Sequence, residues 1–139
     1  MSHNPLADEV WRAMAAVVFD NRDAWKRAVI DRTGLPFSRV RVLRRLAQRP
    51  MTATQIAEAA TMDAPATTVA VNDLEARGLV VRETDPTNRR SKLVSLTDEG
   101  RRVIADIDEV DDPAPDPLAA LSDAELLGLQ AILAKLAGG

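Results

Sequence analysis

The feature that most constrains this fold is a short helix whose first residue the sequence specifies. In "MTATQIAEAA" (51–60), Thr52 is a good N-cap, and Gln55 stands three residues later, where its side chain can bond back to the cap. Met51 and Ile56 flank this pair as a hydrophobic staple. The start of the helix is therefore fixed within one residue.

A second helix follows after a short break around Thr61. In "DAPATTVAVNDLEARG" (63–78), Asp63 stands at the N-cap and Pro65 in the first turn, where proline is tolerated. Gly78 occupies the position of a C-terminal capping glycine. Two short helices joined by a tight turn predict a helix-turn-helix.

Beyond the second helix the hydrophobic period changes from helical to alternating. "LVVRETD" (79–85) and "SKLVSLT" (91–97) are strand-like runs, and "PTNRR" (86–90) between them has the composition of a turn. This stretch predicts a β-hairpin with two adjacent arginines, Arg89 and Arg90, at its tip.

Helical patterns flank this region on both sides. Residues 5–32 predict one helix of about seven turns, long enough to overhang the core and to present part of its apolar face to another chain. An arginine-rich helix is expected over residues 37–49, and Thr97 caps a helix after the hairpin. Residues 111–117, "DDPAPDP", predict a stiff linker without helix, and leucines from 126 to 136 predict a final helix.

Composition removes several classes of function. The 139 residues include no cysteine and one histidine, His3, so thiolate chemistry, zinc sites and imidazole catalysis have no support. We expect no catalytic residue, no metal and no cofactor, and thus no enzyme. No run approaches the roughly 18 apolar residues of a membrane span, and the first residues lack a signal peptide, so a cytoplasmic protein without membrane contact is expected.

Charge is unevenly distributed along a chain whose net charge is −3. Residues 33–50 hold five arginines and no acidic residue, whereas residues 103–139 hold eight acidic residues and one lysine. Such segregation indicates one face that meets a polyanion. Solvated helix faces that happen to cluster are the alternative.

The order helix, helix, helix-turn-helix, hairpin is that of a winged helix-turn-helix, in which the second helix of the motif enters the major groove of DNA. Exposed arginines on the hairpin tip offer permanently charged donors to phosphate or to the minor groove, although they could also be solubilising turn residues. Asn72 suits adenine, and Val69 suits a thymine methyl group. The predicted DNA-binding residues are Thr52, Thr54, Ala66, Thr68, Val69, Asn72, Arg89, Arg90 and Lys92.

At these positions the chain resembles the MarR (multiple-antibiotic-resistance-regulator) transcription factors. The resemblance rests on "LEARGLVVR" (74–82), "DPTNRR" (85–90) and "VSLTDEG" (94–100), within a match over about residues 35–105. Asn88 stands where the family usually has an aspartate that orients the neighbouring arginine.

The resemblance implies one domain over residues 1–139, mainly α with a small β-hairpin wing. A winged helix-turn-helix lobe (35–105) would be joined to dimerisation helices from both termini (5–32 and 118–137). It also implies a small aromatic effector bound between the dimer interface and the lobe, for which Trp11, Met14 and Phe37 are the candidate residues. Packing in the interface or the core is the other interpretation for Trp11, for Trp25 on nearly the same helix face, and for Met14.

These observations predict a homodimeric, sequence-specific DNA-binding regulator on a pseudo-palindromic site, a repressor released by a small aromatic ligand. Because the recognition helix has no lysine or arginine before Arg77, phosphate affinity must come from the wing, the arginine-rich helix and the helix starts. The same absence motivates the alternative of a winged-helix protein–protein interaction module without DNA binding.

Overall fold

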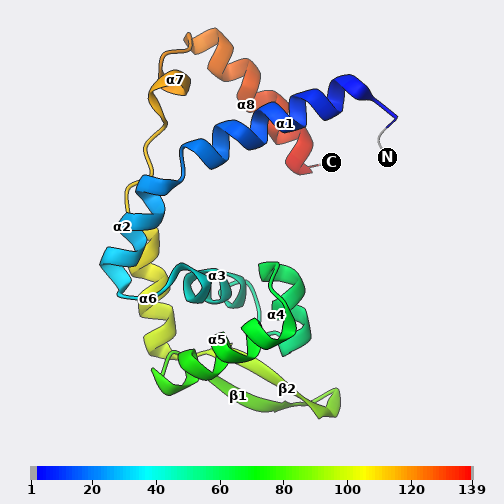
Figure 1. The fold of residues 1–139 in the computed structure, drawn as a ribbon, viewed down its shortest axis with the longest axis vertical. Helices are drawn as coiled ribbons and strands as arrows, with labels where there is room; N and C mark the ends of the chain where they lie inside the picture. The colour runs from blue at the N-terminus through cyan, green and yellow to red at the C-terminus, as the bar shows by residue number, and fades with distance from the viewer. Residues whose placement is uncertain (1–2, 139) are drawn as a thin grey trace.

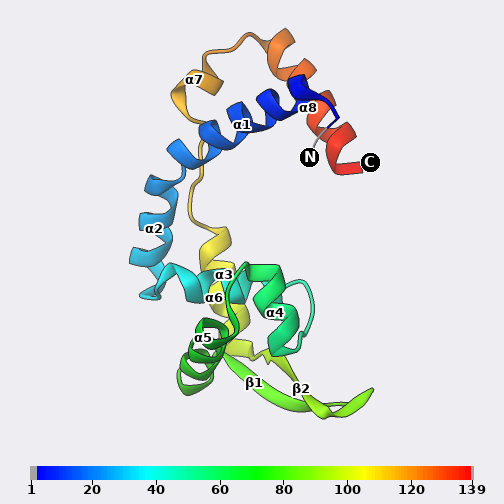
Figure 2. The same ribbon diagram turned by 45° about the vertical axis from the view of Figure 1, so that its right-hand side comes forward.

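The computed structural model describes residues 3–138, which form eight helices and one antiparallel β-hairpin (Figure 1). In chain order the elements are α1 (Pro5–Asp20), α2 (Asp23–Thr33), α3 (Phe37–Leu46), α4 (Ala53–Ala60), α5 (Ala64–Ala76), β1 (Val80–Asp85), β2 (Asn88–Leu96), α6 (Asp98–Asp108), α7 (Asp116–Ala119) and α8 (Asp123–Gly138). Elements α2 to α6 and the hairpin form a lobe at one end, and α1 and α8 lie at the other (Figures 1 and 2). The predicted winged helix-turn-helix is confirmed.

The buried apolar core of the described residues lies within the lobe. Val40 and Leu43 of α3 and Leu74 of α5 are fully buried, and Val94 of β2 and Ile107 of α6 close the core from the other side. The apolar side of the arginine-rich helix therefore packs into the core. No helix among the described residues is both long and apolar enough to cross a membrane.

The helix ends of the helix-turn-helix follow the sequence prediction. Thr52 and Gln55 form both hydrogen bonds of a capping box, at 3.3 and 2.9 Å. Asp63 and Thr97 cap α5 and α6 through their side chains. Gly78 has φ +76°, the left-handed conformation that lets the chain leave α5 and enter β1 directly.

The single helix expected over residues 5–32 is wrong, because the structure has two helices there. α1 ends at Asp20, Asn21 caps it, and α2 begins at Asp23. Nδ2 of Asn21 donates to the carbonyl oxygen of Val17 at 2.7 Å. Aspartate and asparagine side chains compete for backbone hydrogen bonds and so favour a helix end, while the apolar period continues across the break and conceals it.

The C-terminal region departs from the prediction in one detail. Residues 111–115 are irregular, as expected, but α7 (Asp116–Ala119) forms one helical turn in the segment expected to be linker only. Pro117 lies in its first turn, where the missing N–H leaves no helical bond unmade. Ser122 and Glu125 then exchange the two hydrogen bonds of a capping box at the start of α8, at 3.0 and 3.2 Å.

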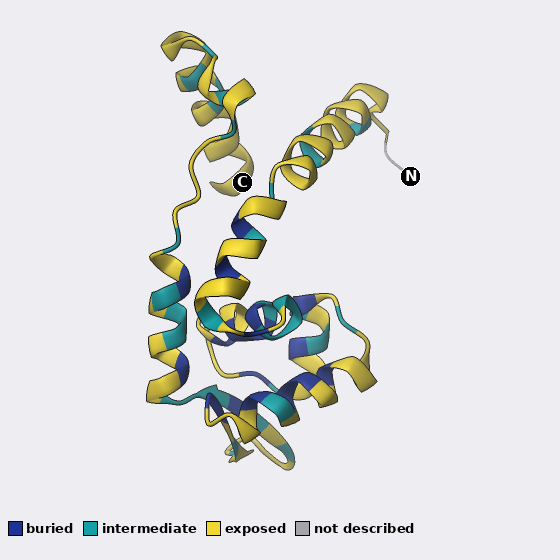
Figure 3. Cartoon of the chain, turned by 60° about the vertical axis from the view of Figure 1, so that its left-hand side comes forward, coloured by how far each residue is buried: buried dark blue, intermediate teal, exposed yellow. Residues whose placement is uncertain are grey.

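Helices α1 and α8 extend from the lobe as two separate arms (Figure 3). No described residue of either helix is buried. The large apolar side chains exposed on the two arms are Leu6, Val10, Trp11, Val17, Val18, Phe19, Leu127, Ile132, Leu133 and Leu136. So large an apolar surface on a single chain is typical of a face that another chain covers.

A close approach of backbones at Gly100 joins α6 to the hairpin. A Cβ atom at Gly100 would lie 2.2 Å from the carbonyl oxygen of Leu79 and 3.2 Å from Cδ2 of Leu96. In the same turn, Oγ1 of Thr97 donates to the carbonyl oxygen of Gly78 at 2.7 Å. Only glycine allows α6 to begin at this distance from the base of β1.

Gly100→Ala is therefore expected to destabilise the lobe by about 1–3 kcal/mol, because the backbone must move to accommodate the methyl group. Urea unfolding followed by far-UV circular dichroism measures the change. The matched control is Gly128→Ala in α8, where an added Cβ meets nothing within 4 Å. An unchanged midpoint for Gly100→Ala would contradict the close packing described above.

Candidate nucleic-acid interface

Helix α5 has one buried and one exposed face, and the predicted base-reading residues lie on the exposed one. The buried residues, as the sequence predicts, are Thr67, Ala70, Val71 and Leu74. The exposed residues of its outer face are Ala64, Pro65, Ala66, Thr68, Val69 and Asn72. Val69 is 58% exposed although it is apolar. Burial of one side of the helix therefore fixes which side chains an outside partner meets.

Thr52 and Thr54 lie at the start of α4. Oγ1 of Thr52 accepts the backbone N–H of Gln55, and its side chain is half-buried, whereas Thr54 is exposed. The free backbone N–H groups of a helix start attract anions, so this corner of the helix-turn-helix suits a DNA phosphate.

Asn72 has a neighbour on the hairpin. Arg82 of β1 donates from Nη2 to Oδ1 of Asn72 at 2.7 Å and from Nη1 to Oε1 of Glu75 at 2.8 Å. In the antiparallel register Arg82 lies opposite the buried Val94. Arg82 therefore extends from the inner face of the hairpin to the exposed edge of α5.

Asp73, on the next position of α5, joins two arginines from different parts of the lobe. Its Oδ2 accepts from Nε of Arg39 in α3 at 2.9 Å and from Nε of Arg77 at 3.1 Å. The hydrogen bond from Arg39, more than that from Arg77, holds the pKa of the Asp73 carboxyl below its ordinary value of 3.8. At neutral pH this carboxylate neutralises Arg77, the arginine at the C-terminal end of α5.

The turn of the hairpin is shorter than the sequence predicts. Asp85 pairs with Asn88, so only Pro86 and Thr87 form the turn. The Asp85 carboxylate accepts the backbone N–H of Thr87 at 2.9 Å and its hydroxyl at 2.8 Å. These bonds, the backbone one first, lower the pKa of Asp85 below its ordinary value.

Arg89 and Arg90 lie in a bulge of β2 and not in the turn itself, which corrects the sequence expectation. Thr84 pairs with Lys92, so the register shifts across residues 89–91, and Oδ1 of Asn88 accepts the backbone N–H of Arg90 at 3.1 Å. Both arginine side chains are exposed, and within the described residues neither forms an ion pair. Bulges redirect side chains at a sheet edge, and here they leave two guanidinium groups open to an outside anion.

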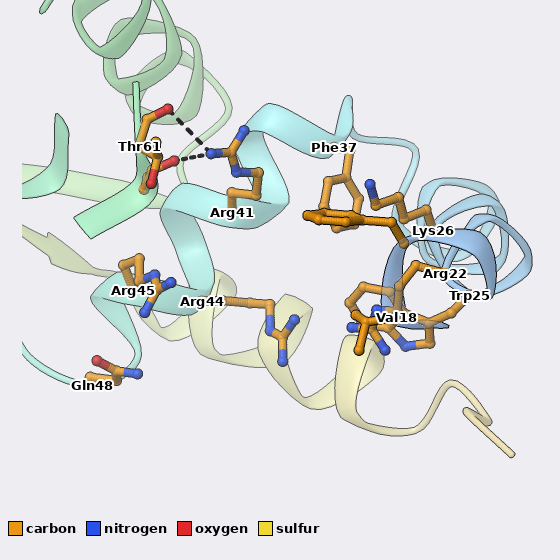
Figure 4. A pocket seen from close by; sticks show the side chains of 12 residues that line it. Val18, Arg22, Trp25, Lys26, Phe37, Arg41, Arg44, Arg45, Gln48 and Thr61 are labelled. Atoms are coloured by element: carbon orange, nitrogen blue, oxygen red, sulfur yellow. Dashed lines mark hydrogen bonds between the residues drawn. The ribbon is translucent and has the colours of Figure 1, made fainter. Parts of the chain in front are cut away.

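Arginines of α3 line a cavity of about 790 Å³ between α2, α3 and the end of α1 (Figure 4). Arg41, Arg44 and Arg45 belong to its wall, and Arg41 also donates to the carbonyl oxygens of Ala60 and Thr61. The sequence predicts that arginines of this helix contribute affinity for phosphate, and in the structure three of them line this cavity.

The wall of this cavity is aromatic and cationic. The Trp25 and Phe37 rings meet edge to face, with centroids 5.7 Å apart and an interplanar angle of 78°. The guanidinium carbons of Arg22 and Arg44 lie 4.0 and 5.1 Å from the Trp25 centroid, and Nζ of Lys26 lies 5.2 Å from the Phe37 centroid. The described residues that line the cavity include no carboxylate, so its potential favours an anion.

Of the three residues predicted to bind a ligand, Phe37 alone lines this cavity. Trp11 and Met14 lie farther along α1, which reaches the cavity only through Val18 and Phe19. The separation along the chain accounts for the difference, because Trp25 follows Trp11 by fourteen positions, roughly 21 Å of helix at about 1.5 Å per residue.

The sequence model of the MarR family matches residues 33–91, from just before α3 to the first residues of β2. A MarR-family transcriptional regulator from Rhodococcus sp. RHA1 is 27% identical, with a TM-score of 0.66 and an alignment covering 98% of this chain and 96% of that one. The chain is similar to the MarR family over these residues and has the fold of MarR-family regulators. No curated protein matches it by sequence.

Two further solved structures show the range of the family fold. The transcriptional regulator BldR from Sulfolobus solfataricus is 25% identical, with a TM-score of 0.68 and coverage of 97% of this chain and 99% of that one. CouR from Rhodococcus jostii RHA1, bound to p-coumaroyl-CoA, is 27% identical, with a TM-score of 0.64 and coverage of 98% and 96%. Both alignments include the two arms as well as the MarR-family lobe.

Sequence reasoning missed Arg82, and it placed Trp25 on one long helix together with Trp11. The alternation of β1 held the signal for the first, because Val80 and Arg82 share the face that packs on α5. An arginine at an inward strand position needs a polar partner within reach. For Trp25, the assumption of one long helix hid the fact that α2 belongs to the lobe.

Proposed function

We propose that this chain is a homodimeric, sequence-specific regulator of transcription that binds double-stranded DNA as a repressor until a small aromatic ligand releases it. The observation that carries the proposal is the bulge of β2, which exposes Arg89 and Arg90 without an ion pair to any described residue. This bulge and α5 lie at the end of the lobe opposite the arms (Figure 2). The regulators similar to this chain support the same function.

In this proposal α5 lies in the major groove and the hairpin reaches the adjacent minor groove. Ala66 and Val69 offer apolar contact to thymine methyl groups, and Thr68 and Asn72 offer polar atoms to base edges. Phosphate affinity comes from groups outside α5, namely Arg89, Arg90 and Lys92 of the hairpin and Thr52 and Thr54 at the start of α4.

The arms make the dimer in this proposal. The apolar residues of α1 and α8, within the predicted segments 5–32 and 118–137, have no cover in the single chain. A second copy would cover them and would place two α5 helices on one pseudo-palindromic site, about 34–36 Å apart. Dimerisation matters for this chain because a single lobe has few cations on the exposed face of α5.

The cavity between arms and lobe is the site we propose for the ligand. Its lining includes Arg22, Lys26, Arg41, Arg44 and Arg45, and the carboxylate that reaches this group is Asp112, paired with Arg22 at 2.7 Å. Unbalanced like charges beside two aromatic rings favour a ligand that is both aromatic and anionic. CouR was solved with p-coumaroyl-CoA, which combines those two properties. Binding there would change the angle between arms and lobe and so the spacing of the two α5 helices.

The wing is tested by the double change Arg89→Ala and Arg90→Ala. Affinity for an operator selected from genomic fragments should fall at low salt, and the slope of log K against log [salt] should decrease in magnitude by up to about 3.6, roughly 0.9 for each of the four arginines that the two wings of a dimer lose. Fluorescence anisotropy over a salt series measures both. The control, Arg12→Ala with Arg27→Ala, removes the same charge far from the hairpin and should leave the slope unchanged.

Equal slopes for the wing variant and the unaltered chain would contradict the assignment of the wing. A chain that binds no duplex at any salt concentration would instead favour the protein–protein interaction module.

The arms are tested by Val10→Glu with Leu133→Glu, which place carboxylates in the centre of the proposed interface. Sedimentation equilibrium should give the mass of one chain for this variant and of two for the unaltered protein. DNA affinity should fall with the dimer. Ile30→Glu on α2, 37% exposed in the lobe, is the matched control and should remain dimeric. A dimeric double variant would show that the contact is made elsewhere.

The ligand site is tested with p-coumarate and its neutral methyl ester. In a Trp11→Phe background the fluorescence reports Trp25 alone, and p-coumarate should quench it and release DNA. Adding Arg44→Met should weaken this binding about tenfold or more, since a hydrogen bond to a charged group is worth about 1.5–3 kcal/mol. Arg12→Met is the control. Equally tight binding of the ester would contradict an anion site.

A further inference from the structure

We propose that Arg82 is a positioning residue that turns the amide of Asn72 so that its donor group faces DNA, which makes this position of α5 read guanine in place of adenine. The proposal rests on the DNA-binding function proposed above and adds a base preference to it. It comes from the fork of hydrogen bonds that joins β1 to the exposed edge of α5.

The strand register fixes where Arg82 lies. Val80, Arg82 and Val94, the cross-strand partner of Arg82, share the inner face of the hairpin, and both valines are fully buried. The Arg82 side chain leaves this core at its edge and is 29% exposed. A side chain anchored in the sheet and half-buried along its stem has less freedom than a surface arginine, so it can hold a neighbour in place.

Two acceptors one helical turn apart hold the guanidinium group. Nη2 donates to Oδ1 of Asn72 at 2.7 Å, and Nη1 donates to Oε1 of Glu75 at 2.8 Å. Residues i and i+3 of a helix lie on the same face, which matches the spread of the two terminal nitrogens. Glu75 also neutralises Arg82, so that the role of Arg82 is orientation and not attraction of phosphate.

The chemistry of guanidinium settles which way the amide points. Arginine has donors only, so the atom of Asn72 that meets it must be the carbonyl oxygen. The amide nitrogen Nδ2 is then directed away from Arg82, and within the described residues it makes no hydrogen bond. Asn72 is exposed, so Nδ2 is the atom it offers to a base.

An asparagine whose amide oxygen already accepts a hydrogen bond from arginine favours a different base from an asparagine whose amide is free. Adenine recognition by asparagine uses both amide atoms, with the oxygen accepting from N6 and the nitrogen donating to N7. Here the oxygen already accepts from a cation, which repels a second donor beside it. Guanine presents two acceptors, O6 and N7, on the same edge and so matches the two N–H groups of Nδ2. Guanine is therefore expected at the base pair nearest Asn72.

The experiment compares base preference among variants. Selection from a random duplex library gives the operator, and the base pair read by Asn72 is the one whose preference Asn72→Ala abolishes. Competition binding then uses duplexes that differ only at that pair. The unaltered protein should prefer guanine over adenine, and Arg82→Met should reduce this preference by roughly tenfold. Arg82→Lys, which keeps a donor in place, should retain most of it.

A purely structural role for Arg82 predicts something else, namely weaker binding to all duplexes alike with the base preference kept. That result, or adenine preferred by the unaltered protein, would overturn the proposal. The matched control is Arg77→Met, because Arg77 bonds to Asp73 and not to Asn72; it should leave the preference at this pair unchanged. If the unaltered protein binds no duplex, the result contradicts the proposed DNA-binding function itself. A preference for another base contradicts only the inference about guanine.

Discussion

Burial of one stripe of α5 is the constraint on which the rest of this protein depends. Thr67, Ala70, Val71 and Leu74 pack into the lobe, and the helix cannot rotate without exposing them. The opposite stripe must therefore face outward, although it carries an exposed valine and almost no charge. In the proposed complex its small apolar side chains would suit the thymine methyl groups of the major groove.

Three groups of cations in this chain have different surroundings. Arg32, Arg39 and Arg82 are held by carboxylates of the lobe and serve its structure. Arg22, Lys26 of α2 and arginines of α3 gather around the rings of the cavity, where the described carboxylates do not balance their charge. The bulge of β2 keeps two adjacent guanidinium groups exposed and without an ion pair to any described residue. A chain of net charge −3 can thus present a small, strongly positive tip.

The lobe could be predicted closely from sequence because its signals are local. Its helix ends are marked by the capping box at Thr52, the cap at Asp63 and the glycine at position 78. Each signal acts within one helical turn, so the helix ends can be predicted without knowledge of distant contacts. The break at Asn21 could not be predicted, because the apolar period runs through it and only the competing side-chain bond ends the helix. The bulge of residues 89–91 depends on register between two strands, and the fork at Arg82 depends on packing of strand against helix; neither is local.

Two short connections join the arms to the lobe, and they meet at one point. Residues 21–22 link α1 to α2, residues 109–115 link α6 to α7, and Nη1 of Arg22 lies 2.7 Å from Oδ2 of Asp112 across the gap. The same Arg22 stacks on Trp25 at the rim of the cavity. The hairpin lies at the end of the lobe far from this junction (Figure 2). A rotation of the lobe by a few degrees about the junction would therefore move the hairpin by ångströms.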